Sequence, residues 1–399
     1  MILKFILLSI ATLYLMTRKW NLYYAIPIKL WLISTYIVYV LSTFIVFNVF
    51  KDYYDLQPNI ANIRLDLYTC FISSFFLFNS IFKKTNYSKI NFPHLPNFQT
   101  FKWFTFIILI LYILLGGIDA RNLYGNEIDS SSNFYWIRGF FDILYITTFI
   151  LAFRKTSYLS IIYILFVVLV MILGGHRAYI VMFALIIISA YSIKGNFKFK
   201  KSILPIIFIT LSLYFITKNR FVESSLPMEY LLFERAYEPT IDRVIEYDEI
   251  YSRKFYFENF ERIITIPIPA FLLPSKKNND DKDEVLENYY GFQISEKSHW
   301  PLPGLVDSFR RFGYVGVVLF TFIMNYFLFF ILKRIKNDSY KVLLYPFIIA
   351  FSFRLFSFSV LGTIAFFLYN LVKMYLILML FQTIQLTLIK NNEKNSFNL

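Results

Sequence analysis

The sequence predicts an all-α polytopic membrane protein with about 11 transmembrane helices and one large extracytoplasmic loop. The chain of 399 residues is 57% apolar, and its apolar residues form repeated runs as long as a helical span. One polar segment, 218–311, interrupts these runs and holds 13 basic and 17 acidic residues. Helices suit the apolar runs because lipid offers no hydrogen-bond partner for backbone N–H and C=O groups.

The chain divides at the polar segment. Residues 1–217 form a membrane domain with the first spans, 218–311 form the large loop, and 312–399 carry the last three spans. The expected spans are Met1–Met16, Ile26–Phe50, Leu65–Phe82, Phe104–Gly117, Ile137–Phe153, Tyr158–Leu173, Ala178–Ile193, Ile203–Thr217, Gly313–Leu332, Val342–Phe353 with its continuation, and Thr363–Ile389. The first run is short enough for a signal peptide, but its charges follow the apolar residues, so we expect a retained helix.

Basic residues gather on one side of the expected membrane. The loops of that side hold 18 basic residues, against only Asp338 and Glu393 among the acidic ones. The positive-inside rule makes this side cytoplasmic. The N-terminus and the large loop then face outward, and the C-terminus lies in the cytoplasm. The net charge of +14 therefore reflects topology, and we expect no nucleic-acid partner.

We expect neither a metal nor a cofactor. The single cysteine, Cys70, excludes an internal disulfide framework, and no zinc, nucleotide-phosphate or hydrolase motif is present in the sequence. Asp281 and Asp283 form a short DxD pattern, which binds a metal and a diphosphate in some glycosyltransferases. They lie in the charged run Asn278–Glu287, which favours a solvated loop.

Two stretches of the loop have a recognisable local pattern. After Pro239 the apolar residues follow helical spacing, and Asp242 and Glu246 share the other face, which predicts an amphipathic helix. Ile264–Pro274 holds three prolines and no charge. Because proline prevents a regular helix, we expect an extended apolar segment that returns towards the membrane.

Arg177 is the first candidate for chemistry. It ends the tight turn Gly174–Arg177 between two expected spans. Its planar fork matches phosphate oxygens, so an anion site at the outer ends of two helices is the functional interpretation. The alternative is a snorkelling arginine that anchors a helix end. Three arginines of the loop either contact a diphosphate or pair with neighbouring carboxylates: Arg220, Arg235 and Arg243.

His299 and Asp307 stand where the loop returns to the membrane, just before the expected span at Gly313. Either side chain is a candidate general base for a sugar hydroxyl. A surface histidine and a helix-capping aspartate are the alternatives. Trp300 is a stacking platform for a sugar or an interfacial residue. Arg354 interrupts an apolar run, where a charge faces a cavity or a partner, unless it marks the outer end of a helix pair.

The order of these features resembles the Wzy-type polymerases of lipid-linked oligosaccharide repeat units, which build O-antigen, capsule and related polysaccharides. The large outward loop lies before the last three spans. Three motifs add to the resemblance: the turn Gly174–Arg177, the apolar-Pro-x-Lys element Leu273–Lys276, and the re-entry segment Pro303–Gly316, which ends in Phe-Gly-x-x-Gly. The related O-antigen ligases have a loop histidine where His299 stands, but the residues after it differ here. Asp307 fills the acidic position in place of a glutamate.

The resemblance implies a metal-independent glycosyltransferase of the GT-C type in the bacterial cytoplasmic membrane. Its substrates are an undecaprenyl-diphosphate-linked glycan donor and a similar acceptor, and its expected partners are a flippase and a chain-length regulator. It implies catalytic roles for Arg177, His299 and Asp307. It also implies substrate contacts for Arg220, Arg235, Arg243, Lys276, Trp300, Arg311 and Arg354. Competing interpretations are a lipid-linked-oligosaccharide flippase, a ligase-like transferase and a non-catalytic partner of a synthase complex.

Overall fold

All regular secondary structure in the described residues is helical, which confirms the predicted class for this part of the chain. The computed structural model describes residues 1–17, 22–51, 57–81, 98–115, 142–153, 158–173, 177–193, 241–242, 244–246, 303–334 and 338–355, with isolated positions from 360 to 379. Of the polar loop, it therefore describes a short stretch near 244 and the last residues before 312. The expected span at 203–217 lies outside these ranges.

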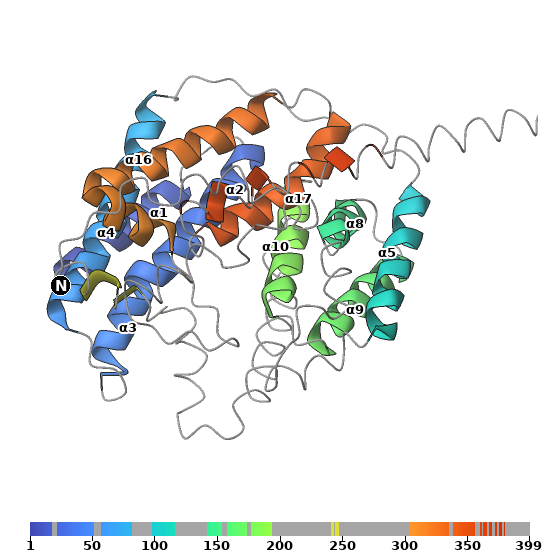
Figure 1. Ribbon diagram of the computed structural model, residues 1–399, viewed down its shortest axis with the longest axis horizontal. Helices are drawn as coiled ribbons and strands as arrows, with labels where there is room; N and C mark the ends of the chain where they lie inside the picture. The colour runs from blue at the N-terminus through green and yellow to red at the C-terminus, as the bar shows by residue number, and fades with distance from the viewer. Residues whose placement is uncertain are drawn as a thin grey trace, which may run out of the picture.

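Figure 1 shows how the helices follow one another along the chain. They are α1 (Ile2–Thr17), α2 (Leu22–Tyr36), the π-helix η1 (Ile37–Leu41), α3 (Ser42–Asn48), α4 (Pro58–Ile81), α5 (Phe98–Leu114), α8 (Asp142–Phe153), α9 (Tyr158–Leu173), α10 (Arg177–Ile193), α16 (Gly304–Arg334) and α17 (Asp338–Arg354). Among the described residues, three stretches are long and apolar enough to cross a membrane: Ile26–Asn48, Pro58–Ile81 and Gly304–Lys333. These apolar helices indicate a membrane protein.

The helix α4 begins at Pro58, well before Leu65, where the sequence predicts the start of this span. Proline suits the first turn of a helix, where its missing N–H would have no helical partner. Arg64 and Asp66 consequently lie inside the helix, and each has an oppositely charged partner. Because paired charges are tolerated inside a span, the helix extends beyond the apolar run.

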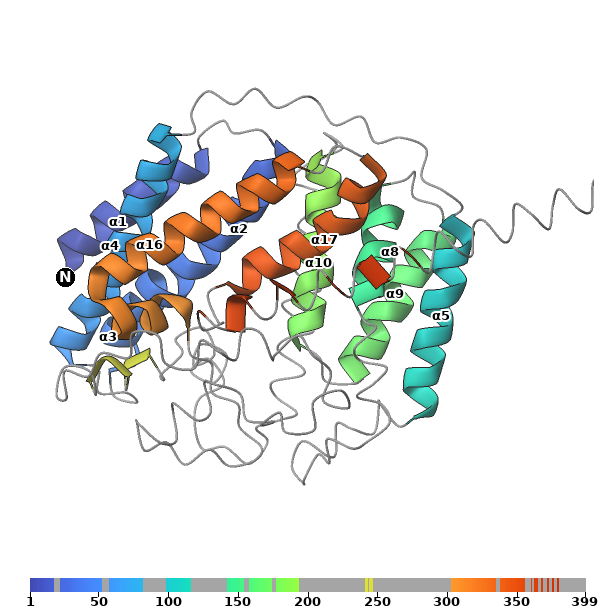
Figure 2. The same cartoon turned by 45° about the horizontal axis from the view of Figure 1, so that its top comes forward.

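The described helices form two groups, and α17 joins them. In the first group α1, α2, α3 and α4 pack together, and α16 lies along α4. The second group contains α5, α8, α9 and α10. α17 contacts α2 of the first group and α8 and α10 of the second, so it bridges the two (Figures 1 and 2).

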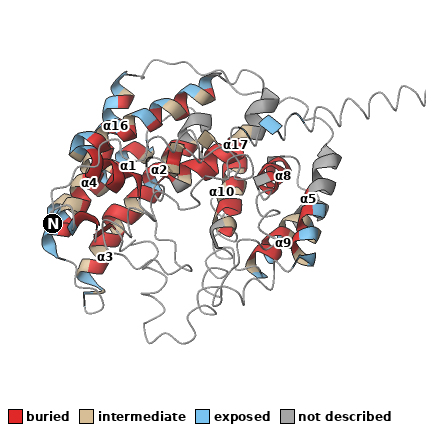
Figure 3. Ribbon diagram, in the orientation of Figure 1, coloured by how far each residue is buried: buried red, intermediate tan, exposed pale blue. Residues whose placement is uncertain are grey.

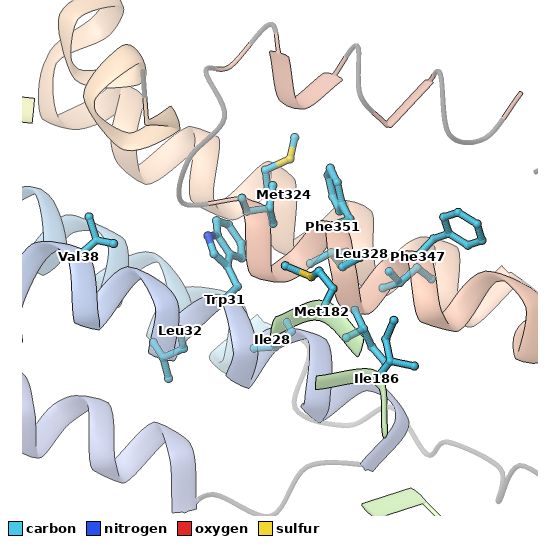
Figure 4. Packing of buried hydrophobic residues seen from close by; sticks show 14 of the residues in the cluster. Ile28, Trp31, Leu32, Val38, Met182, Ile186, Met324, Leu328, Phe347 and Phe351 are labelled. Atoms are coloured by element: carbon cyan, nitrogen blue, oxygen red, sulfur yellow. The ribbon is translucent and has the colours of Figure 1, made fainter. Parts of the chain in front are cut away.

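Buried side chains lie between the helices, whereas the outer faces are exposed and largely apolar (Figure 3). Figure 4 shows the core where the groups meet: Trp31 of α2, Met182 of α10 and Phe351 of α17 lie close together. On the outer faces, Leu3 of α1 is 71% exposed and Val315 of α16 is 66% exposed. Helices that contact lipid present apolar outer faces of this kind, because hydrocarbon is their solvent.

Candidate functional site

The polar loop returns to the helices through α16, which is broken near its start. Gly313 has a φ of 64° and a ψ of −156°, so it leaves the helical conformation. Glycine adopts a positive φ at little cost because it has no Cβ. The segment that ends at Phe312 and the segment that starts at Tyr314 therefore meet at a corner, which Figure 2 shows at the left end of α16.

Gly316 allows the two segments of α16 to approach closely at this corner. A Cβ at position 316 would overlap the carbonyl oxygen of Ser308 and would lie 2.8 Å from the Cβ of Phe312. Neither atom can rotate away, because one is backbone and the other is attached directly to it. The Phe-Gly-x-x-Gly pattern thus has a physical reason: Gly313 turns the chain, and Gly316 makes room for the turned segment.

Asp307 lies in the first turn of α16 and links this corner to a distant segment. Its Oδ1 accepts hydrogen bonds from Nε of Arg310 at 2.6 Å and from Nε of Arg311 at 3.1 Å. Its Oδ2 accepts the backbone N–H of Val360 at 2.8 Å. The three charged side chains are buried, and buried charges persist only with such partners. The cluster therefore fixes the start of α16 against the chain beyond α17.

The geometry favours a positioning role for Asp307. A general base needs a lone pair within reach of the proton that it removes. Both carboxylate oxygens of Asp307 already accept hydrogen bonds, and its side chain is fully buried. The catalytic role of Asp307 and the substrate contact of Arg311 stay predictions, and in this structure the two side chains contact each other.

A second buried ion pair connects the loop to α4. Oδ1 of Asp242 lies 2.5 Å from Nη1 of Arg64, although the two residues are 178 positions apart. The side chain of Arg64 is fully buried and that of Asp242 is 5% exposed. Nη2 of Arg64 also donates to the carbonyl oxygen of Val38 at 2.9 Å, in η1. One guanidinium therefore joins the loop, α4 and the helix that contains η1.

The stretch at 241–246 is the described part of the predicted amphipathic helix. Its buried apolar side chains are those of Ile241, Val244 and Ile245. Glu246 is exposed, as expected for the polar face. Asp242 differs: the sequence places it on the same face as Glu246, but it is buried because Arg64 pairs with it. Figures 1 and 2 both place this stretch, in yellow, beside α3 and the corner of α16.

A third ion pair joins α1 to α4. Nζ of Lys4 lies 2.6 Å from Oδ1 of Asp66 and 3.4 Å from the carbonyl oxygen of Asn62. The side chains of Lys4 and Asp66 are 31% and 43% exposed, so this pair is much less buried than that of Arg64. Its presence explains how Asp66 is accommodated inside a predicted span.

The remaining predicted site residues lie at helix ends or outside the described ranges. Arg177 is the first residue of α10 and Arg354 is the last residue of α17, and neither side chain belongs to the described part. The predicted residues outside the described ranges are Arg220, Arg235, Arg243, Lys276, His299 and Trp300. Within the described ranges, His, Cys, Asp and Glu side chains form no group of three that could hold a metal ion. Asp281 and Asp283 lie outside those ranges.

The sequence analysis missed Arg64 and Arg310. The sequence does contain a pattern that predicts the contact of Arg310. Arg310 and Arg311 follow Asp307 at spacings of three and four residues, which place all three on one helix face. Arg64 had only a weak signal, a charge next to the predicted start of a span. Its partner Asp242 is too distant in the sequence for a local pattern to connect them.

Comparisons of the chain with protein-family models, with curated proteins and with solved structures found no significant match. The described residues by themselves define a helical protein with helices long and apolar enough to cross a membrane. In it, two buried charge clusters tie parts of one polar loop to the helices.

Proposed function

We propose that this protein polymerises lipid-linked oligosaccharide repeat units on the outer face of the bacterial cytoplasmic membrane. The observation that carries the proposal is the corner of α16, where Asp307, Arg310 and Arg311 are buried beside the turn at Gly313. This corner occupies the re-entry segment through which the sequence resembles the Wzy-type polymerases. The proposal includes about 11 spans with the large loop outside.

The reaction joins two undecaprenyl-diphosphate-linked glycans. A terminal hydroxyl oxygen of one repeat unit attacks the anomeric carbon of the growing chain. The bond from that carbon to the diphosphate oxygen breaks, and undecaprenyl diphosphate leaves with the bonding electrons. The hydroxyl proton passes to a general base, and we assign this role to His299 because the oxygens of Asp307 already accept hydrogen bonds.

Arginines stabilise the leaving group in this proposal. Negative charge grows on the diphosphate as the bond breaks, and donors fixed in advance lower the barrier because they need no reorganisation. The residues assigned to this role are Arg177, Arg220, Arg235 and Arg243. Because their charges neutralise the diphosphate, the reaction needs no metal ion.

The outer faces of the helices suit the polyprenyl chains of both substrates. Leu319 and Ile323 are exposed on α16, the helix that also forms the corner. Lipid chains held along such faces keep both glycans close to the loop. Two reactants that are held together react at a high effective concentration, which supports a polymerase at this position.

Purified protein in detergent micelles, incubated with lipid-linked repeat units and EDTA, tests the proposal. We expect a ladder of products that differ by one repeat unit. A flippase forms no ladder, because it moves its substrate across a membrane without making a glycosidic bond. A ladder that needs a second added transferase indicates a non-catalytic partner, and transfer only to a different acceptor indicates a ligase. Either of these results, or unreacted single units, overturns the proposal.

A further inference from the structure

Arg64 is held in one orientation by two different acceptors. Its Nη1 contacts Asp242 of the loop, and its Nη2 donates to the carbonyl oxygen of Val38. A guanidinium is planar, so two bonds from two nitrogens fix its plane as well as its position. The orientation of Asp242 is thereby set with respect to two helices rather than one.

The acceptor on the second helix exists because η1 is a π-turn. The backbone N–H of Ser42 bonds to the carbonyl oxygen of Ile37, one residue further back than in an α-helix. The carbonyl oxygen of Val38 accepts instead from the hydroxyl of Ser42 and from Arg64. Single π-turns inside α-helices are frequent at functional sites, because they free a backbone group for another partner.

Apolar packing alone would not fix the loop stretch in one register. Ile241, Val244 and Ile245 bury their side chains, but apolar contact is not directional. The bond from Asp242 to Arg64 is directional, and a buried charge that loses its partner is strongly unfavourable. The ion pair therefore selects one docked position for the loop stretch.

We propose that Arg64 and Asp242 form a latch that holds the first part of the polar loop against α4 and η1. We further propose that Arg64 is a positioning residue for glycan transfer, and this second step rests on the proposed polymerase function. Arg243, a predicted diphosphate contact, directly follows Asp242 in the sequence. The latch therefore lies next in the sequence to an arginine that the reaction is proposed to use.

Thiol labelling of purified full-length protein in detergent tests the latch without reference to activity. In a Cys70→Ser background, Ile245→Cys places a thiol at a buried position, and Glu246→Cys places one at the adjacent exposed position. We expect a water-soluble maleimide to label the second thiol quickly and the first slowly. Asp242→Asn or Arg64→Gln should raise the labelling rate at position 245 by about tenfold, because local opening exposes it. The rate at position 246 should not change.

The matched control is Asp66→Asn, which removes a carboxylate from α4 whose partner, Lys4, is far more exposed. We expect this variant to leave the labelling at position 245 unchanged. Asp242→Glu keeps the negative charge, so the thiol at position 245 should still label slowly. Unchanged labelling of Ile245→Cys in a folded Asp242→Asn protein overturns the latch.

A second measurement applies if the single-charge variants do not accumulate. Arg64→Met with Asp242→Leu removes both charges together, so no unpaired charge stays buried. In the Cys70→Ser background, we expect the thiol of Ile245→Cys to label faster in this double variant than in the protein that keeps the ion pair, because apolar contact alone does not fix the docked position. Labelling at position 245 that stays slow in the double variant overturns the latch.

A measurement of polymer synthesis then distinguishes failure of the latch from failure of the proposed polymerase function. If the unmodified protein makes no polymer while labelling behaves as expected, the polymerase function fails and the latch stands. If it does make polymer, we expect Asp242→Asn to slow chain growth about tenfold at saturating substrate, and Asp242→Glu to restore it. Normal synthesis by Asp242→Asn, together with raised labelling, overturns the positioning role of Arg64.

Discussion

The backbone N–H of Val360 donates a hydrogen bond to Oδ2 of Asp307 at 2.8 Å, across 53 positions of sequence. The other oxygen of the same carboxylate accepts from Arg310 and Arg311. One side chain thus joins the end of the polar loop, the corner of α16 and the chain beyond α17. Loss of the charge of Asp307 should therefore weaken the contacts among all three segments.

We expect Asp307→Asn to lower the free energy of unfolding by about 3 kcal/mol, because it removes the charge that two buried guanidinium groups contact. The measurement is the thermal stability of the detergent-solubilised protein, followed by size-exclusion chromatography. Asp66→Asn is the control: its pair with Lys4 is half-exposed, and such pairs contribute about 1 kcal/mol or less. Equal losses of stability in the two variants would contradict the buried cluster.

The two glycines of the α16 corner should differ in their tolerance of alanine. Gly316→Ala brings a Cβ into the carbonyl oxygen of Ser308, so the segments must separate. Gly313→Ala meets nothing within 4 Å, but the φ of 64° and ψ of −156° are essentially restricted to glycine, a strain of about 1–3 kcal/mol. We expect Gly316→Ala to lower the thermal stability more than Gly313→Ala does. The reverse order would show that the segments pack differently at this corner.

The helical class could be predicted from the sequence, because apolar runs are local patterns and local patterns determine helices. The inward face of the amphipathic stretch could be predicted for Ile241, Val244 and Ile245 for the same reason. Gly313 was expected to begin a span, whereas in the structure it forms a corner inside α16, which begins at Gly304.

The partners of the buried charges could not be predicted. Arg64 and Asp242 are brought together by the fold, and neither residue has a neighbour that identifies the other. The same holds for the bond from Val360 to Asp307. A start of α4 at Pro58 depends on such pairing too, because unpaired charges at 64 and 66 would favour a helix that begins after them.

Topology is the next prediction, and it rests on the 18 basic residues that gather on one side. Reporter fusions at Lys198, Lys336 and Lys394 should report the cytoplasm. A fusion near Asp281 should report the outside. Phosphatase activity outside and fluorescence inside are the measurements. A cytoplasmic signal from Asp281 would overturn both the orientation and the assignment of the polymerase to the outer face.

The proposed reaction should proceed without a metal ion. We expect Asp281→Ala combined with Asp283→Ala to keep normal polymer synthesis, since a charged run suits a solvated loop. EDTA should likewise leave the product ladder of the purified protein unchanged. The measurement is chain length by gel electrophoresis at matched protein level. Loss of polymer under either treatment would move the site to this DxD pattern and restore a metal-dependent mechanism.

Arg177 gives the sharpest test of the proposed site. It is the first residue of α10, and it follows Gly174, Gly175 and His176 of the predicted outward turn. The N-terminal end of a helix carries a partial positive charge, which disfavours a cation but favours an anion. The helix end therefore does not stabilise a cation at this position. An anionic diphosphate bound beside it would be stabilised by both the helix end and the arginine.

The lysine variant separates these two roles. Arg177→Ala should abolish polymer and leave single repeat units, with the protein still present in the membrane. Arg177→Lys keeps the charge but loses the planar fork that pairs with two phosphate oxygens, so it should also be severely impaired. A contact made only in the transition state is worth about 3 kcal/mol, or about a hundredfold in rate. An anchoring arginine would tolerate lysine, because snorkelling needs only a long stem and a charge. Near-normal chain length in Arg177→Lys, at matched protein level, would thus assign Arg177 to anchoring and move the diphosphate contacts to the loop arginines.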